Sequence, residues 1–190
     1  MHSHFTAVFD ACVLYPATLR NFLLQLATTG LFRARWTNQI HDEWMRSLAA
    51  RRPDIGLEPL ERIRFQIDRA VPDCLVTGFE PLVESLELPD PNDRHVLAAA
   101  IVCGANVIVT MNERDFPEDL LAPHGIAAQD PDRFVLHQFD LDPGAVCTSA
   151  KTMRRRLQRP AYDPFEFLDL LQARGLPGTA SRLREFIQLI

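Results

Sequence analysis

The sequence of 190 residues lacks the features that mark membrane, secreted and zinc-binding proteins. No apolar run approaches the roughly 18 residues that a membrane-spanning helix needs. The first ten residues, MHSHFTAVFD, lack the basic segment and the long apolar segment of a signal peptide. The four cysteines are scattered, without a Cys-x-x-Cys pair, and predict buried free thiols in a reducing compartment. We therefore expect a cytoplasmic protein without membrane contact.

Lysine is almost absent: arginine supplies nineteen of the twenty cationic side chains. The net charge of −5 argues against a general nucleic-acid binder, whose surface is usually basic. The charge is uneven, however: residues 150–190 hold eight basic and four acidic side chains, against twelve and twenty-one in residues 1–149. Because arginine binds phosphate through two hydrogen bonds, an acidic body with an arginine-rich end is compatible with a cation site and a phosphate-bearing partner.

Segments typical of strands and helices alternate along the first 130 residues. Short β-branched or apolar runs predict strands at 5–11, 31–36, 74–79, 106–110 and 126–129. Apolar residues at helical spacing, with Gly or Pro at the ends, predict helices at 16–30, 37–53, 57–71, 80–86, 93–105 and 117–125. This alternation predicts a three-layer α/β/α fold with a mostly parallel central sheet.

After residue 130 the pattern changes, and no further strand is expected. Three helices, at 143–160, 163–175 and 179–190, are separated by Pro and Gly. We place a boundary near residue 140, between a domain at 1–140 and a helical C-terminal extension at 141–190. The basic run KTMRRRLQR, at 151–159, has three explanations that the sequence leaves open: a surface for RNA backbone, a contact with an acidic partner, or a solvated helix face.

Acidic side chains stand at the ends of the predicted strands and the starts of the helices. Asp10 ends the first strand, Asp93 heads the alanine-rich helix, and Asp115 lies five residues beyond Thr110, where the strand NVIVT ends. Glu43 lies in the helix after the second strand. Ligand sites of open α/β sheets lie at the carboxyl ends of the strands, so these acids should meet at one rim.

Like charges brought together raise each other's pKa unless a cation compensates them, so this convergence implies a metal ion. The ligands are all oxygen, with no His or Cys placed to join them, which favours Mg²⁺ or Mn²⁺ over zinc. Each acid also has a structural explanation. Asp10 and Asp93 stand where helix N-caps are expected, a role that stabilises a helix by about 0.5–2 kcal/mol. Asp115 could shape a turn, and Glu43 could be solvated.

Three stretches of the chain together resemble the PIN-domain family, in particular the VapC-like toxins of bacterial toxin–antitoxin pairs. They are FTAVFDACVLYP, IHDEW and DPNDRHVLAAAIVCGANVIVTMNERDF, and the likeness covers about residues 4–136. Its most specific part is the ordered set D-x10-G-A, an apolar strand and T-x-N-x-x-D-F. The resemblance implies a PIN-like fold and a ribonuclease that depends on Mg²⁺ or Mn²⁺. It also implies an RNA substrate such as tRNA or rRNA, an antitoxin partner and a homodimer.

The resemblance also assigns roles to individual residues. Four acids correspond by position to the family's catalytic and metal-binding acids: Asp10, Glu43, Asp93 and Asp115. Thr110 and Asn112 match polar positions that help to orient the metal site, and Cys12 stands where many relatives carry Ser, Thr or Asn. Arg94 and Arg114 adjoin two of the acids and could contact RNA phosphates or form surface ion pairs. Asp90 could support the metal site or only shape a turn.

Two other functions remain open at this stage. A phosphatase of the haloacid dehalogenase type also has an Asp after its first strand, but it usually needs a second Asp two residues later, where this chain has Cys12. A non-catalytic PIN-like module that binds RNA or protein is the other alternative. Four intact acids argue against that module, because binding alone does not require a repulsive cluster of carboxylates.

Overall fold

The first predicted strand lies inside a four-stranded parallel sheet of order β2-β1-β3-β4. The computed structural model describes residues 5–190 and forms its strands at β1 (Thr6–Phe9), β2 (Arg33–Arg35), β3 (Val107–Val109) and β4 (Ala127–Gln129). In β1, Ala7 pairs with Ala34 on one side and with Val107 on the other. The chain adds β2 on one side of β1 and then β3 and β4 on the other side. The strand order therefore reverses between β1 and β3, and the carboxyl ends of these two strands form the switch point where such folds bind ligands.

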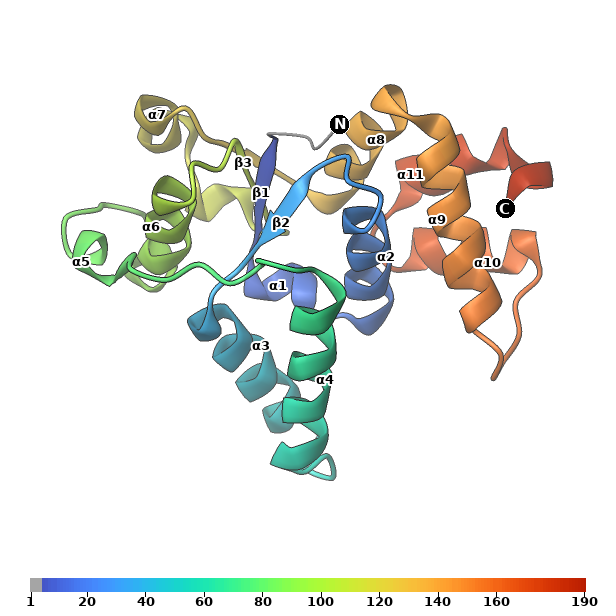
Figure 1. Cartoon of the computed structure of the whole chain (residues 1–190), viewed down its shortest axis with the longest axis horizontal. Coiled ribbons are helices and arrows are strands. Elements are labelled where there is room, and N and C mark those ends of the chain that lie inside the picture. The colour runs from blue at the N-terminus through green and yellow to red at the C-terminus, as the bar shows by residue number, and fades with distance from the viewer. Residues whose placement is uncertain (1–4) are drawn as a thin grey trace.

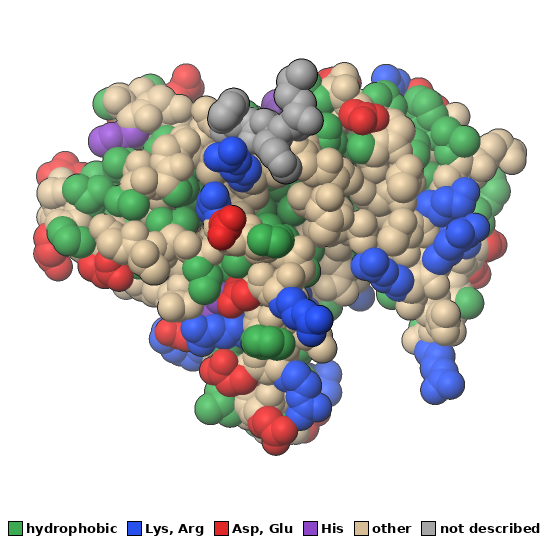
Figure 2. All heavy atoms as spheres, in the orientation of Figure 1, with side chains coloured by type: hydrophobic (Ala, Val, Ile, Leu, Met, Phe, Trp, Pro, Cys, Tyr) green, Lys and Arg blue, Asp and Glu red, His purple; other side chains and the backbone are tan. Residues whose placement is uncertain are grey.

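Helices cover both faces of this sheet, which confirms the predicted three-layer arrangement (Figure 1). On one side α6 (Arg94–Val102) packs on β1 and β3, with α5 (Glu80–Val83) outside it. On the other side lies α2 (Ala17–Ala27). The remaining helices before residue 130 are α1 (Ala11–Leu14), α3 (Asn38–Arg51), α4 (Leu57–Ala70) and α7 (Glu118–Leu121). Helices α3 and α4 project as an arm, and a notch separates this arm from the C-terminal helices (Figure 2).

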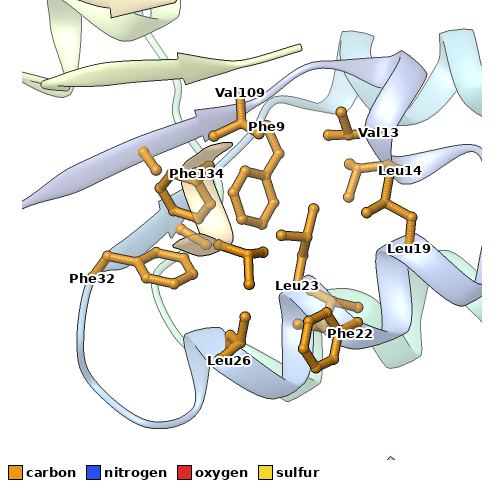
Figure 3. Close-up of a cluster of buried hydrophobic side chains, with 14 of the residues drawn as sticks. Phe9, Val13, Leu14, Leu19, Phe22, Leu23, Leu26, Phe32, Val109 and Phe134 are labelled. Carbon is orange, nitrogen blue, oxygen red and sulfur yellow. The ribbon is translucent and has the colours of Figure 1, made fainter. Parts of the chain in front are cut away.

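The core between the sheet and α2 is built from aromatic and branched side chains (Figure 3). Phe134 packs edge-on against two other rings, with centroids 6.0 Å from Phe9 and 4.8 Å from Phe32. Such pairs add about 0.5–1.5 kcal/mol each beyond the burial of their surface. Because Phe134 lies in α8 (Pro131–Leu141), one hydrophobic core joins the sheet to the start of the C-terminal helices.

A chain of polar contacts fixes the arm formed by α3 and α4. The Trp44 indole donates to His41 Nδ1 at 2.9 Å, so His41 donates through Nε2 to Asp68 Oδ1 at 2.8 Å. Asp68 also accepts a hydrogen bond of 2.8 Å from the Trp36 indole. Burial lowers the pKa of His41, which agrees with a neutral ring that donates at one nitrogen and accepts at the other. The two helices are therefore tied together by a satisfied network.

Helix α8, which the sequence did not indicate, precedes the C-terminal extension, and this extension is helical, as predicted. The extension contains α9 (Pro143–Arg156), α10 (Pro164–Ala173) and α11 (Pro177–Arg184). These three helices and α8 each start with proline, whose missing N–H costs nothing at that position. Asp132 of α8 accepts hydrogen bonds from the backbone of Gly178 and Thr179 at 2.6 and 2.7 Å. Within residues 5–190, no helix is long and apolar enough to cross a membrane.

The strand predicted at 74–79 does not form. Leu75 makes only an isolated parallel bridge with Trp36. Asp73 and Gly78 adopt left-handed backbone conformations, with φ of 59° and 77°, and so limit the extended segment between them. Its apolar residues are explained by burial instead, because Val76 and Phe79 pack against the alanines of α6.

Candidate active site

An open cleft of about 760 Å³ lies at the carboxyl ends of β1 and β3. Five carboxylates line it: Asp10, Glu43, Asp90, Asp93 and Asp115. They come from the end of β1, from α3, from the turn before α6 and from the segment after β3. The four predicted acids therefore share one cleft, at the position that the parallel sheet predicts for a ligand site.

Asp10 is held by a small hydrogen-bonding network behind the cleft. Its Oδ2 accepts from Thr110 Oγ1 at 2.8 Å and from Cys12 Sγ at 3.0 Å, and its Oδ1 accepts from the Ala11 amide. Burial raises the pKa of the Cys12 thiol, as does the neighbouring Asp10 charge, so the thiol keeps the proton that it donates. Thr110 is itself fully buried and does not line the cleft, but it contacts Asp10 there.

Asp93 does not cap α6, which corrects an expectation from the sequence. Asp90 takes the capping role, because its side chain accepts from the Asn92 amide at 2.9 Å and closes the short turn Pro91–Asp93. Asp93 makes no capping hydrogen bond. Burial raises the pKa of Asp93 to about 7, and the charges of the other four carboxylates in the cleft add to this rise. Asp93 therefore experiences the repulsion that a bound cation would relieve.

Glu43 lies against a histidine that the sequence did not place at the site. His95 Nε2 is 2.8 Å from Glu43 Oε1, although the two groups are not aligned as a hydrogen bond. The ring is buried, and among the described residues neither nitrogen has a hydrogen-bond partner. Two side chains outside the four predicted acids therefore contact them: His95 lies against Glu43, and Cys12 donates to Asp10.

Asp115 lies at the rim of the cleft in the short helical turn Glu113–Asp115. The Asn112 side chain donates a hydrogen bond to Asp115 Oδ2, and the Asp115 amide donates to the Asn112 carbonyl at 3.1 Å. The Asn112 amide in turn donates to Thr110 Oγ1 at 3.0 Å. Asn112 therefore links Asp115 to the same network that holds Asp10, which agrees with a supporting role.

Two family models match the chain, and they divide it near residue 130. The model of the PIN domain matches residues 6–114. The chain belongs to the PIN-domain family. The model of the VapC50 C-terminal domain matches residues 131–185 of this PIN protein, which makes it a VapC-like member with a C-terminal extension.

A protein of Mycobacterium tuberculosis (strain ATCC 25618 / H37Rv) with the name "Putative ribonuclease VapC50" is similar to this PIN protein. The two are 41% identical over 132 residues, which is 70% of this chain and 76% of the relative. No solved structure matches.

The arginines that the sequence placed near the acids are not among the residues that line the cleft of the PIN domain. Arg114 is exposed outside it, and Arg94 is half-buried with an unpartnered Nε. Ser47 and Arg51 line the cleft instead, at four-residue intervals from Glu43 on α3. That spacing places all three on one helix face and could have identified them from the sequence.

The donor set of the PIN domain suits a hard divalent cation, which PIN nucleases generally use. Carboxylate oxygens predominate in the cleft, and their charges add to the burial that raises the pKa of Asp93. Within residues 5–190, however, no group of three or more His, Cys, Asp or Glu side chains is arranged to hold a metal ion. Asp10, Glu43 and Asp115 each contact a neighbouring side chain instead. Metal binding would therefore require Glu43 and Asp115 to turn toward Asp10 and Asp93.

Proposed function

We propose that this PIN protein is a metal-dependent endoribonuclease and the toxin of a type II toxin–antitoxin pair. The observation that carries the proposal is the shared cleft of Asp10, Glu43, Asp93 and Asp115, in which charge repulsion helps to raise the pKa of Asp93. Membership of the PIN family and the likeness to a protein named as a ribonuclease support the same function. We propose tRNA or rRNA as the substrate, an antitoxin as the protein partner, a homodimer and a cytoplasmic location.

In this proposal Asp10, Asp93 and Asp115 hold the cation, and Glu43 joins them directly or through water. Bound Mg²⁺ or Mn²⁺ supplies charge neutralisation and polarisation of the scissile phosphate. Thr110 and Cys12 fix Asp10 by their hydrogen bonds, so that one carboxylate is already oriented before RNA arrives.

The remaining parts of the cleft suit an RNA backbone. Arg51 stacks on the Tyr15 ring, with 5.9 Å between its guanidinium carbon and the ring centroid, and offers a cation at the edge of the acidic cleft. Hydrolysis would leave a 5′-phosphate and a 3′-hydroxyl. We further propose that residues 1–140 form the nuclease domain and 141–190 the helical extension. Arg94 and Arg114 would reach RNA phosphates only outside the cleft.

Incubation of the purified protein with total RNA and Mg²⁺ tests this function. We expect cleavage by the wild type, none with EDTA, and a loss of at least about 100-fold in the Asp93→Asn variant, the scale on which electrostatic groups in active sites contribute. Asp140→Asn is a matched control, because Asp140 is exposed on α8 and outside the cleft.

Cleavage that persists in EDTA and in the Asp93→Asn variant would show that the carboxylate cleft is not the nuclease site. If the wild type binds RNA but cleaves none, the protein is instead a non-catalytic binding module. Growth arrest on expression, relieved by Asp93→Asn, would support the toxin role. Co-purification with the product of the neighbouring gene, followed by loss of cleavage, would support the antitoxin.

A further inference from the structure

A second groove lies between the body of the protein, the arm and the C-terminal extension. It has a volume of about 540 Å³, and its walls come from α2, α4 and the end of α9. Arg20 and Leu24 contribute from α2, Ile63 and Gln66 from α4, and Arg156 from α9. In the space-filling view, basic side chains stand on both sides of the notch between the arm and the C-terminal helices (Figure 2).

The groove adjoins the acidic cleft through a shared wall. Arg20 lines the groove and lies over the ring of Trp44, with 5.3 Å between its guanidinium carbon and the ring centroid, while Trp44 lines the cleft. Arg20 is buried and also donates to the Leu14 carbonyl at 2.8 Å. The wall is rigid, because Trp44 belongs to the network that ties α3 to α4. The cleft and the groove therefore lie on the two sides of one pair of side chains, and a linear polymer that contacts both must pass around this pair.

Arg156 lines the groove, and two further arginines lie close to it in the chain. Arg155, Arg156 and Arg159 are exposed, and within residues 5–190 none of them forms an ion pair. A cation in the last turn of a helix stabilises it by about 0.3–1 kcal/mol, which accounts for Arg155 and Arg156. Arg159 lies beyond the end of α9, where the helix gives no reason for a charge.

The segment that carries these arginines is held in place by another arginine. Arg154 donates to the Tyr162 carbonyl at 3.0 Å and to the Ile190 carbonyl at 3.4 Å, and so closes the loop that contains Arg159. No acidic residue occurs anywhere in α9. In a chain of net charge −5, exposed arginines at the end of α9 and on the held loop after it suit an anionic polymer rather than solvent alone.

We propose that RNA held in the cleft continues along this groove, and that Arg155, Arg156 and Arg159 bind its phosphates. This inference rests on the proposed ribonuclease function and assigns the C-terminal extension a role in substrate binding. The contacts are to the backbone and not to bases, so they add affinity for RNA of any sequence. Short RNA that fills only the cleft gains nothing from them.

The test measures binding of a labelled single-stranded RNA of about 20 nucleotides of mixed sequence, in EDTA, over a range of salt concentrations. Changing Arg155, Arg156 and Arg159 together to Gln should lower the slope of log K against log salt by about 2, because each phosphate contact on a single strand contributes about 0.7. At about 0.1 M salt this corresponds to roughly 100-fold weaker binding. The same three positions changed to Lys should keep most of the slope.

A matched control removes three charges elsewhere, by changing Arg33, Arg174 and Arg184 to Gln. These residues line neither the cleft nor the groove. Equal RNA affinity in the two Gln variants, at equal thermal stability, would overturn the inference. Retained RNA binding with lost capture of the purified antitoxin would also overturn it, in favour of a protein partner.

Cleavage of total RNA by the wild type reports separately on the proposed function. If no RNA is cleaved but the arginine variant still loses affinity, the ribonuclease proposal fails and the groove remains an RNA-binding surface. If the wild type cleaves RNA and the arginine variant binds it as tightly as the wild type, only the groove is refuted.

Discussion

Replacing Asp93 by Asn should stabilise the metal-free protein at alkaline pH. The pKa of Asp93 is raised to about 7, mainly by burial and then by the charges of neighbours such as Asp10 and Asp115. The unfolded carboxyl has a pKa near 3.8, so the native state holds the proton more tightly than the unfolded state between these values. The contribution of Asp93 to the free energy of unfolding is therefore greatest below about pH 4 and falls as pH rises to 7, after which no more is lost.

The size of this effect follows from the shift. A rise from 3.8 to about 7 corresponds to at most about 4 kcal/mol, at roughly 1.4 kcal/mol for each pH unit. Asp93 is only partly buried, so solvent screening reduces this to about 2 kcal/mol. Asn keeps the shape of the neutral acid without the ionisation penalty. For a chain of this length, about 2 kcal/mol raises the melting temperature by roughly 4–8 °C.

Thermal unfolding followed by circular dichroism, in EDTA, measures the difference between variant and wild type. We expect a clear advantage of Asp93→Asn at about pH 8 and almost none near pH 4. Adding Mg²⁺ at about 100 times its dissociation constant should stabilise the wild type by about 2.7 kcal/mol and the variant much less. The reasoning is refuted if the advantage is the same at both pH values, or if the control Asp140→Asn gains as much.

Three further changes test other contacts. Thr110→Val removes the hydroxyl that donates to Asp10. It should lower the free energy of unfolding in urea by about 1–3 kcal/mol and should also reduce RNA cleavage; unchanged cleavage would show that Asp10 needs no orientation. His95→Ala should reduce the Mg²⁺-induced rise in melting temperature by freeing Glu43, and His95→Gln should restore part of it; equal rises in all three proteins would contradict this role. Gly178→Ala should cost about 1–3 kcal/mol in thermal unfolding, because the added methyl would lie 2.9 Å from a carboxylate oxygen of α8, while cleavage by the folded protein stays unchanged.

The acidic cleft could be predicted because strand ends are encoded locally. An apolar run that stops at Asp10 or Thr110 marks the end of a buried strand, and parallel strands bring such ends to one edge. The position of Glu43 followed from the helix after β2. Which side chains the acids contact could not be predicted, because the contact between His95 and Glu43 depends on how α3 and α6 pack.

Other failures have similarly local causes. Asp93 was expected to cap α6, but Pro91 allows a short turn in which Asp90 caps first. The apolar residues at 74–79 indicated a strand, whereas burial against α6 satisfies them without a ladder of hydrogen bonds. Helix α8 was missed because the boundary was placed by composition, whereas the apolar face of this helix packs in the core beside the sheet.

The ring of Phe134 limits how modular this protein can be. It lies between Phe9 of the sheet and Phe32 just before β2, so α8, at which the match to the VapC50 C-terminal domain begins, also completes the core beside the sheet. A PIN domain without large side chains at the positions of Phe9 and Phe32 would leave the Phe134 ring without these packing partners. Moving residues 131–185 onto another PIN domain would therefore require the three aromatic residues Phe9, Phe32 and Phe134 to be transferred together.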